Sequence, residues 1–388
     1  MKKNNIKVHK IYILILFTII IISCDNKTKN SPSPRIKSAL KIISPISNEI
    51  IKKDDSIKIS LDTNNNIDKE IMRSTLIYDY DTINFIKKLE IPTNNFKKYG
   101  KYKLIIKTEY SDGSFENFHK NILLYPKDKP KELEYEVIRI LPHDPNSYTQ
   151  GLLVDMNNFI ESSGQYGKSY IRRIDINSGK VIKNVNIDQN LFAEGISIYD
   201  EKLYMLTWKN KTGLIFDKNS FEKIREFKYE TEGWGLTTID DKLVMSDGTE
   251  KIYFRDSETF ELLYFIEVYD NNGIVTNINE LEFINNKIYS NIYGKDIILC
   301  INYKTGKVEN IIKLDTLFNR SNFSDKIDVM NGIAYNEKNN SIFITGKWWP
   351  SIFEIKINNN GVKWNNKKSK RISQRYLWWN GIKGKICF

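Results

Sequence analysis

The feature that most constrains this chain is an internal repeat with a period of about 40 to 45 residues. One series of sites has the pattern Asp/Asn-x-x-Ser/Thr-Gly/Phe-Lys/Glu, and its members begin at Asp175, Asp217, Asp256 and Asn302. A second series lies out of phase with the first: Gln150-Gly151-Leu152, Glu194-Gly195-Ile196, Trp234-Gly235-Leu236, Glu280-Leu281-Glu282 and Asn331-Gly332-Ile333. The second series indicates five repeats.

Apolar and polar side chains alternate within the repeats, for example in segments 202–207 and 287–293. This period of two is typical of β-strands, whereas helical solenoids of similar repeat length show apolar spacings of three and four. A repeat of this length with about four short strands is typical of a β-propeller blade. The sequence therefore predicts an all-β chain with a five-bladed β-propeller over residues 135–358.

A second β-rich region precedes the repeats. It consists of short alternating runs and polar turn clusters, at 56–61, 62–66, 102–106, 111–114 and 121–125. Strands and turns at this spacing predict a small immunoglobulin-like β-sandwich over residues 39–127. The polar segment 126–131 is interpreted as a linker, and nothing in the sandwich region suggests catalysis.

The N-terminus has the composition of an export signal. Residues 1–23 combine a lysine-rich start with an apolar run at 11–22, which is shorter than the roughly 20 residues of a spanning helix, and they predict a signal peptide. Ser23-Cys24 resembles a bacterial lipobox, so Cys24 is the expected lipidation site. The alternatives are an uncleaved anchor or an ordinary signal with an incidental cysteine. Residues 24–38 predict a flexible tether, and we expect an exported protein anchored on the periplasmic or surface side of a bacterial membrane.

The formal charge of +11 is concentrated at the two ends of the chain. Residues 1–23 and 361–388 contain many lysines or arginines and no acidic residue, which leaves the rest of the chain close to neutral. A neutral body argues against a groove that tracks nucleic-acid phosphates. We interpret the basic tail, 359–388, as a disordered extension, with contact to anionic lipid as the alternative.

Cysteine and histidine are too scarce for the usual metal sites. After Cys24 the chain contains two cysteines, Cys300 and Cys387, and the whole chain contains three histidines, His9, His119 and His143. This inventory contains no Cys-x-x-Cys pair and no disulfide framework, and it disfavours a His-dependent catalytic triad. The sequence therefore predicts no metal and no cofactor.

Polar and aromatic residues are expected to gather at one mouth of the propeller, because the innermost strands of all blades line the central channel. The second repeat series supplies Gln150, Glu194, Glu232, Trp234, Asn279, Glu280, Glu282 and Asn331, and close to it lie Trp208, Lys347, Trp348 and Trp349. Buried carboxylates are costly unless they are paired or used in chemistry. The alternative is that the polar groups connect neighbouring blades and that the indoles belong to the core.

A set of longer motifs runs in order along residues 137–357. They are Leu141-Pro142-His143-Asp144-Pro145, Tyr148-Thr149-Gln150-Gly151-Leu152, Gly164-Gln165-Tyr166-Gly167-Lys168-Ser169, Phe192-Ala193-Glu194-Gly195, Leu206-Thr207-Trp208, Glu232-Gly233-Trp234-Gly235-Leu236, Met245-Ser246-Asp247-Gly248-Thr249, Asn279-Glu280-Leu281-Glu282, Asn331-Gly332-Ile333-Ala334 and Thr345-Gly346-Lys347-Trp348-Trp349-Pro350. This ordered set resembles the plant and bacterial glutaminyl-peptide cyclotransferases, a family with a five-bladed propeller fold.

The resemblance implies cyclisation of an N-terminal glutamine to pyroglutamate with release of ammonia, by a metal-independent aminoacyltransferase. The substrate's own α-amine attacks its side-chain amide, so the protein must move a proton and stabilise an oxyanion rather than supply a nucleophile. Glu194 matches the family's acidic position and is the expected proton carrier, with a pKa raised by its aromatic setting. Lys347, Asn279 and Gln150 are the expected hydrogen-bond donors by family position.

The resemblance also implies an aromatic cage around the glutamine side chain, formed by Tyr148, Phe192, Trp208 and Trp234. Such a cage excludes water, which favours cyclisation over hydrolysis. Where family members commonly carry a tryptophan after the Asn-Glu-Leu-Glu motif, this chain has Tyr293. A smaller ring with a hydroxyl there predicts an altered substrate preference or weaker activity.

Two other functions fit a propeller with aromatic residues at its mouth, because the fold alone implies no activity. One is a non-catalytic peptide-binding propeller, and the other is a glycan-binding propeller lipoprotein with an open aromatic face. The zinc-dependent animal type of glutaminyl cyclase is disfavoured by the scarcity of histidine. We expect a monomer that acts on peptides or proteins beginning with glutamine and that does not bind nucleic acid.

Overall fold

A computed structural model describes residues 38–64, 67–79, 81–317 and 326–358. The helical content of these residues is one 3-10 turn, Thr93–Asn95, and the remaining elements are β-strands. No helix in these ranges has the length and apolar character needed to cross a membrane. The prediction of an all-β chain is confirmed.

The N-terminal region consists of two sheets that share one apolar core. Their strand orders are β1 (Leu40–Ser44), β3 (Ser56–Thr63), β6 (Lys88–Pro92), and β2 (Glu49–Lys52), β8 (Phe115–Tyr125), β7 (Gly100–Tyr110), β4 (Ile71–Tyr78), β5 (Asp81–Phe85). Buried and exposed residues alternate along β7, so one face of this sheet packs inward. Ile57, Leu76 and Leu104 are fully buried in the shared core. The region is therefore a β-sandwich, and its immunoglobulin type stays a prediction.

Five sheets follow among the described residues, each with four antiparallel strands, and the fourth sheet is extended by a short parallel fifth strand. From inner to outer strand they are β11 (Thr149–Asp155), β12 (Asn158–Ser163), β13 (Tyr170–Asp175), β14 (Val181–Asn186); β15 (Ala193–Tyr199), β16 (Lys202–Thr207), β17 (Thr212–Asp217), β18 (Lys223–Lys228); β19 (Leu236–Ile239), β20 (Lys242–Ser246), β21 (Lys251–Asp256), β22 (Leu262–Glu267); β25 (Ile278–Ile284), β26 (Lys287–Ile292), β27 (Ile297–Asn302), β28 (Val308–Lys313); and β29 (Met330–Asn336), β30 (Ser341–Gly346), β31 (Ser351–Ile357), β10 (Tyr135–Pro142).

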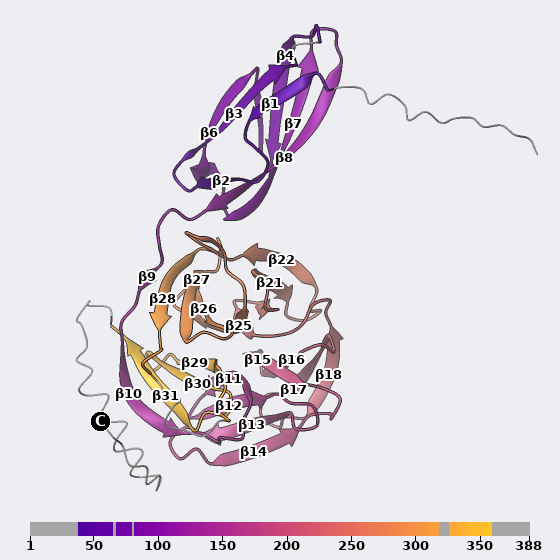
Figure 1. The fold of residues 1–388 in the computed structure, drawn as a ribbon. Helices are drawn as coiled ribbons and strands as arrows, with labels where there is room; N and C mark the ends of the chain where they lie inside the picture. Colours follow the sequence, from indigo (N-terminus) through magenta and orange to yellow (C-terminus); the bar gives the residue numbers. More distant parts are fainter. Residues whose placement is uncertain (1–37, 65–66, 80, 318–325, 359–388) are drawn as a thin grey trace, which may run out of the picture.

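The five sheets surround a common centre. Their innermost strands contact one another in the order β11, β15, β19, β25, β29 and back to β11, and Figure 1 shows β11, β15, β25 and β29 near the middle with β14, β18 and β22 at the rim. The ring closes through β10, which comes from the beginning of the propeller and pairs with β31 from its end. This is the arrangement of a β-propeller.

The first repeat series forms the hairpin turns between the third and fourth strands. In each turn the leading side-chain oxygen accepts the backbone N–H three residues later, as in Asp175 with Ser178 at 2.8 Å and Asp256 with Thr259 at 2.8 Å. Asp217 and Asn302 do the same. These are Asx turns, in which the side chain replaces a backbone acceptor. The fifth sheet has no such motif because β10, its outer strand, is not joined to β31 by a hairpin.

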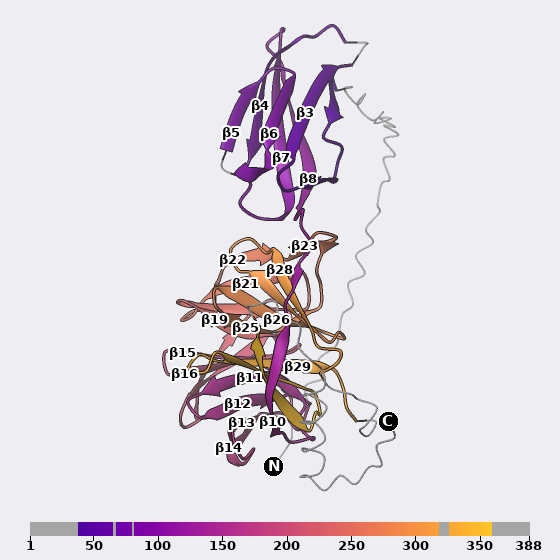
Figure 2. The same cartoon turned by 90° about the vertical axis from the view of Figure 1, so that its left-hand side faces the viewer.

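The sandwich contacts the propeller near β22 and β28 (Figures 1 and 2). Backbone N–H of Tyr99 donates to the carbonyl oxygen of Thr305 at 3.3 Å, and the rings of Tyr125 and Tyr269 lie 5.3 Å apart. Tyr269 belongs to a short hairpin of β23 (Tyr269–Asp270) and β24 (Gly273–Ile274). The connecting strand β9 (Lys131–Glu132) pairs with β28 in parallel, so the chain joins a propeller sheet upstream of the predicted start at residue 135.

Candidate active site

The ring residues of the second repeat series lie at irregularities in the inner strands. The strand register shifts between Thr149 and Gly151, between Ala193 and Ile196, between Ile278 and Leu281, and between Met330 and Ile333. Each shift spans one of the predicted residues, in order Gln150, Glu194, Asn279 and Asn331. A β-bulge interrupts pairing and redirects a side chain, so the same device places all four residues at the channel.

Glycine next to these residues allows the inner strands to come close together. A Cβ atom on Gly195 would lie 2.5 Å from the carbonyl oxygen of Trp234, and one on Gly235 would lie 2.1 Å from the carbonyl oxygen of Asn279. Neither distance is compatible with a larger residue unless the neighbouring strand moves. Glycine at these positions is therefore a packing requirement of the narrow channel.

In the fourth sheet Glu280 occupies the position that corresponds to Gly195 in the second sheet. The carboxylates of Glu280 and Glu282 connect neighbouring sheets. Glu280 accepts the backbone N–H of Ile333 at 2.9 Å, and Glu282 accepts that of Tyr335 at 3.0 Å. Burial raises the pKa of Glu280 well above its ordinary value and raises that of Glu282 to about 8. For these two residues the interpretation as connections between blades is the one that the contacts support.

Glu194 lies at the start of β15 and is buried, with 5% of its surface exposed. Its Oε1 accepts a hydrogen bond from Nε2 of Gln150 at 3.1 Å. Burial raises the pKa of Glu194 well above its ordinary value, Lys347 opposes this shift, and Glu232 adds to it. Glu194 can therefore hold a proton under conditions in which an exposed glutamate is ionised.

Gln150 is itself fixed in place by the neighbouring sheet. Nδ2 of Asn331 lies 3.2 Å from the backbone carbonyl oxygen of Gln150 and 3.4 Å from its Oε1, and it donates toward both. The amide of Gln150 thus has its oxygen turned to Asn331 and its nitrogen to Glu194. In this arrangement Gln150 orients the carboxylate.

Lys347 follows β30 and brings a buried ammonium group to the same place. Its Nζ lies 4.6 Å from the ring centre of Tyr148 and 5.3 Å from that of Tyr293. Burial lowers the pKa of Lys347, while Glu194 and Asp328 raise it. The Tyr148 hydroxyl donates to Oδ2 of Asp328 at 3.3 Å, so a second carboxylate borders the site.

The predicted aromatic residues form a connected wall. Tyr148, Phe192 and Trp208 follow one another with ring-centre distances of 6.2 Å and 5.5 Å, and Trp234 lies 5.9 Å from Tyr293. The side chain of Tyr293 is partly exposed, with 42% of its surface accessible. One ring of each group, Tyr148 and Tyr293, lies beside the Lys347 ammonium.

Glu232 joins the two halves of this wall. Its Oε2 accepts the indole N–H of Trp208 at 2.7 Å and that of Trp234 at 3.0 Å. Both indoles are half-buried, and each has its N–H bonded to the same carboxylate oxygen. The carboxylate therefore sets the relative orientation of the two indoles.

Asn279 is buried on β25, next to the other ring residues. Its carbonyl oxygen accepts the hydroxyl of Ser246 at 2.6 Å, which connects β25 to β20. Among the described residues the structure does not join its side chain to Glu194 or Lys347. Asn279 is thus placed at the channel without a direct contact to the predicted proton carrier.

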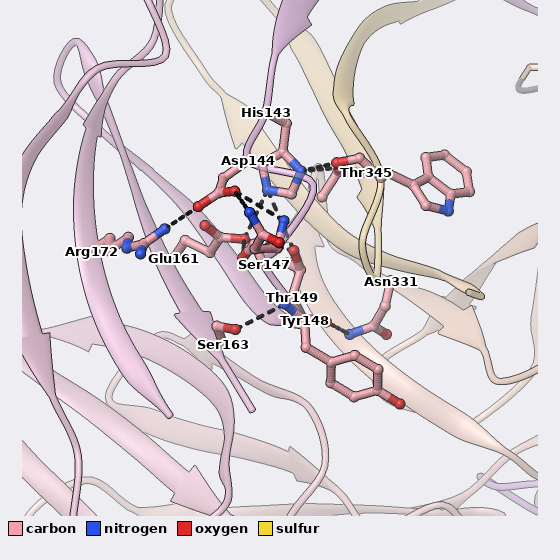
Figure 3. Close-up of polar contacts among 12 residues, drawn as sticks. His143, Asp144, Ser147, Tyr148, Thr149, Glu161, Ser163, Arg172, Asn331 and Thr345 are labelled. Carbon is pink, nitrogen blue, oxygen red and sulfur yellow. Dashed lines mark hydrogen bonds and ion pairs between the residues drawn. The ribbon is translucent and has the colours of Figure 1, made fainter. Parts of the chain in front are cut away.

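The sequence reasoning missed a buried cluster behind the wall, in which His143 and Glu161 are in contact (Figure 3). Glu161 lies in β12, a strand whose other central residues are buried. An acidic residue inside such a run was the available signal, because a buried carboxylate requires a partner. Asp328, which also borders the site, carried no comparable signal, whereas Trp348 was among the indoles expected at the mouth and its ring lies 4.7 Å from that of Tyr148.

Several predicted features lie outside the described residues. They are the signal peptide 1–23, the lipidation site Cys24, all of the tether but residue 38, the tail 359–388 and Cys387. Within the described residues no three His, Cys, Asp or Glu side chains gather as a metal-ligand group. Cys300 is buried, and burial raises the pKa of its thiol to about 12.

Three comparisons relate this chain to known proteins. A family model described as glutamine cyclotransferase matches residues 113–357. A glutaminyl-peptide cyclotransferase of Arabidopsis thaliana is 37% identical over 237 residues, which is 60% of this chain and 74% of that protein. The crystal structure of the Myxococcus xanthus glutaminyl cyclase superposes with a TM-score of 0.55 at 32% identity, over 59% of this chain and 99% of that one.

Proposed function

Because this chain belongs to the glutamine cyclotransferase family, we propose that it converts the N-terminal glutamine of peptides or proteins to pyroglutamate and releases ammonia. The single observation that carries this proposal is the environment of Glu194. This buried carboxyl has one amide donor, a raised pKa and an aromatic wall beside it. A group with these properties is suited to proton transfer near neutral pH.

The proposed reaction forms one bond and breaks one. The free α-amine of the substrate attacks its own side-chain amide carbon, and the bond from this carbon to the amide nitrogen then breaks. Glu194 takes a proton from the attacking amine and delivers it to the departing nitrogen, which leaves as ammonia. Because both reacting groups belong to one residue, holding the substrate in a folded conformation supplies much of the rate.

Lys347 and Asn279 are the proposed donors to the oxyanion that develops during the attack. Preorganised donors in a site that excludes water act more strongly than the same groups in solution. The Lys347 ammonium is buried between two tyrosine rings, which limits its mobility. Trp208, Trp234, Phe192, Tyr148 and Tyr293 are the proposed walls for the glutamine side chain.

The direct test is incubation of the purified protein with a peptide that begins with glutamine, followed by mass spectrometry for loss of ammonia. The control peptide carries an acetylated N-terminal glutamine, which has no free amine and cannot cyclise. We expect conversion of the first peptide and none of the second. A folded protein that binds the free-amine peptide without converting it would instead be a peptide-binding propeller.

We also propose that turnover needs no metal ion, because amine attack with proton transfer requires no Lewis acid. Treatment with a strong chelator should then leave the rate unchanged. Loss of activity that returns only on addition of zinc would reject this part of the mechanism.

For its location, we propose export and lipid anchoring through Cys24, which rests on the sequence of the N-terminus. Cells that express the full chain should incorporate a labelled fatty acid into it, and Cys24→Ser should abolish the label and release the protein from membranes. Cys387→Ser is the matched control, because it removes another cysteine near the opposite end. Membrane retention of an unlabelled Cys24→Ser protein would favour an uncleaved anchor.

A further inference from the structure

A buried ionic pair lies directly behind the candidate site, between the first and last sheets of the propeller. His143 follows β10, Glu161 lies on β12, and the exposed fractions of their side chains are 1% and 0%. Nε2 of His143 lies 2.9 Å from Oε1 of Glu161 (Figure 3). The proposed reaction does not use either group, so their burial needs another explanation.

The contacts of the imidazole define its protonation state. Nε2 faces Oε1 of Glu161, and Nδ1 faces the carbonyl oxygen of Trp349 at 2.5 Å. Oε1 of Glu161 already accepts the hydroxyls of Ser147 at 2.5 Å and Thr149 at 2.6 Å, which favours an ionised carboxylate. Both ring nitrogens thus face acceptors, whereas a neutral imidazole has a single N–H. His143 is therefore an imidazolium.

Electrostatics agree with this assignment. Burial by itself lowers the pKa of His143, but Glu161, the carbonyl of Trp349 and Asp144 raise it above its ordinary value. Burial likewise raises the pKa of Glu161, but His143 and the two hydroxyls lower it overall. Asp144 is paired with Arg172 at 2.7 Å, so its charge is shared with a second cation.

The carboxylate of this pair holds the segment that carries Tyr148. Ser147 and Thr149, which donate to Glu161, flank Tyr148 in the chain. The backbone N–H of Tyr148 donates to Oγ of Ser163 at 2.9 Å. Fixing the residues on both sides of Tyr148 fixes the backbone from which its ring extends into the site.

The imidazolium holds the turn that carries Lys347. Trp348, the next residue, has φ of +59°, which is an unfavourable backbone conformation for a bulky side chain. Strained residues of this kind persist only where surrounding contacts enforce them. Two hydrogen bonds enforce the conformation of Trp348. Its N–H donates to the carbonyl oxygen of Ser147 at 2.7 Å, and the carbonyl oxygen of Trp349 accepts from His143.

We propose that the His143–Glu161 pair is a positioning device for the cyclisation reaction, which holds the Lys347 turn and the Tyr148 segment in register with Glu194. The imidazolium fixes one part of the site and the carboxylate fixes the other, and their ion pair joins the two. Within the described residues Oε2 of Glu161 has no hydrogen-bond partner, so the carboxylate depends on the contacts of Oε1. This inference rests on the proposed function of the site.

The test compares the single variant His143→Gln with the double variant His143→Gln/Glu161→Gln. A glutamine amide can donate to Glu161 but cannot also donate to the Trp349 carbonyl, so the Lys347 turn loses its restraint. We expect kcat to fall about 10- to 100-fold in the single variant, with a lower Tm. In the double variant no buried charge is left unpaired, so Tm should recover while kcat stays low.

The matched control is Asp155→Asn, which breaks the ion pair of Arg173 and Asp155 at 2.6 Å in the same sheet. This variant should lower Tm without changing kcat. A double variant that recovers both Tm and kcat would overturn the inference, because the pair would then be purely structural. If the wild-type protein does not convert a glutamine peptide, the proposed function fails and the inference fails with it. An active wild type with an unchanged kcat in His143→Gln overturns the inference alone.

NMR of the protein with ¹⁵N-labelled histidine tests the protonation state independently of activity. We expect two protected N–H signals from one imidazole at pH 8, both of which disappear in His143→Gln. A single N–H signal from His143 would overturn the assignment of an imidazolium and, with it, the ion pair to Glu161.

Discussion

Glu161 and Glu194 are two buried carboxyl groups of the same propeller, and burial has opposite outcomes for them. The pKa of Glu161 lies below its ordinary value, although burial opposes this, because His143 and two hydroxyls surround Oε1. The pKa of Glu194 lies well above its ordinary value, because burial outweighs the attraction of Lys347. The difference follows from the number and charge of the donors in direct contact with each group.

This comparison separates two uses of a buried acid. A carboxylate with a bonded cation and several donors keeps its charge and connects parts of the chain. A carboxyl group with a single amide donor, such as Glu194 with Gln150, is poised to exchange a proton. Substitution of each carboxyl group by an amide shows whether Glu161 and Glu194 keep these separate roles.

The largest expected effect is on turnover in Glu194→Gln. Glutamine has a similar shape and still faces Gln150, but it cannot accept and release the proton. General acid–base catalysis contributes roughly 10²- to 10⁴-fold to rates, so kcat should fall within this range. KM should change little, because the aromatic wall is intact, and steady-state kinetics measure both values.

Stability provides the control for this variant. Glu194 has a raised pKa, so replacing it with a neutral amide should leave Tm unchanged or slightly higher. A near-normal kcat in a folded Glu194→Gln protein would end the assignment of Glu194 as the proton carrier.

The second prediction is that Glu161→Gln lowers stability where Glu194→Gln does not. The change leaves the His143 imidazolium buried without its counter-charge, and breaking a buried ion pair costs about 3–5 kcal/mol. Denaturant unfolding of both variants at pH 7 measures the free energies of unfolding. Equal stabilities for the two variants would contradict the distinction between a paired and a poised carboxyl group.

The third prediction concerns the dependence of stability on pH. Burial raises the pKa of Glu282 to about 8, so between its ordinary value of 4.5 and about 8 the folded protein keeps a proton that the unfolded chain has lost. This group therefore makes the free energy of unfolding fall as pH rises through that window, with no further change above it. Glu161, with its lowered pKa, does the opposite and loses its contribution as pH falls below its ordinary range.

Glu282→Gln isolates this contribution. The amide oxygen can still accept the backbone N–H of Tyr335, but the titration is removed. We expect the difference in unfolding free energy between pH 5 and pH 8 to be smaller in the variant than in the wild type. An unchanged difference would show that the carboxyl of Glu282 titrates near its ordinary value.

The propeller could be predicted because its signals are local. The Asx turns at Asp175 and Asp256 depend on residues within a few positions, and they recur wherever a third strand turns into a fourth. Glycines such as Gly195 and Gly235 mark the inner strands because the close approach of neighbouring strands excludes a Cβ. Each of these requirements selects particular residue types at fixed spacings, so it is recognisable in the sequence before the fold is known.

The finer geometry of the site could not be predicted, because it depends on residues that are distant in the chain. His143 meets the carbonyl of Trp349 only after β10 has paired with β31 and closed the ring. The positive φ of Trp348 is enforced by a hydrogen bond to Ser147, which lies just before β11 of the first sheet. Glu280 and Glu282 belong to the same ring motif as Asn279, yet only the register with β29 makes them connections between blades.

The smallest expected effect tests Glu232, a third carboxylate whose donors are the two indoles of Trp208 and Trp234. Trp208→Phe keeps a ring beside Phe192 but removes one of the two N–H donors. A hydrogen bond of this kind contributes about 0.5–1.5 kcal/mol, so KM should rise roughly 2- to 10-fold as the wall loosens, while kcat stays close to the wild-type value. Trp234→Phe removes the other donor of the same carboxylate and is the matched control, with an effect of similar size. A fall in kcat in either variant as large as that of Glu194→Gln would move the proton-transfer role from Glu194 toward Glu232.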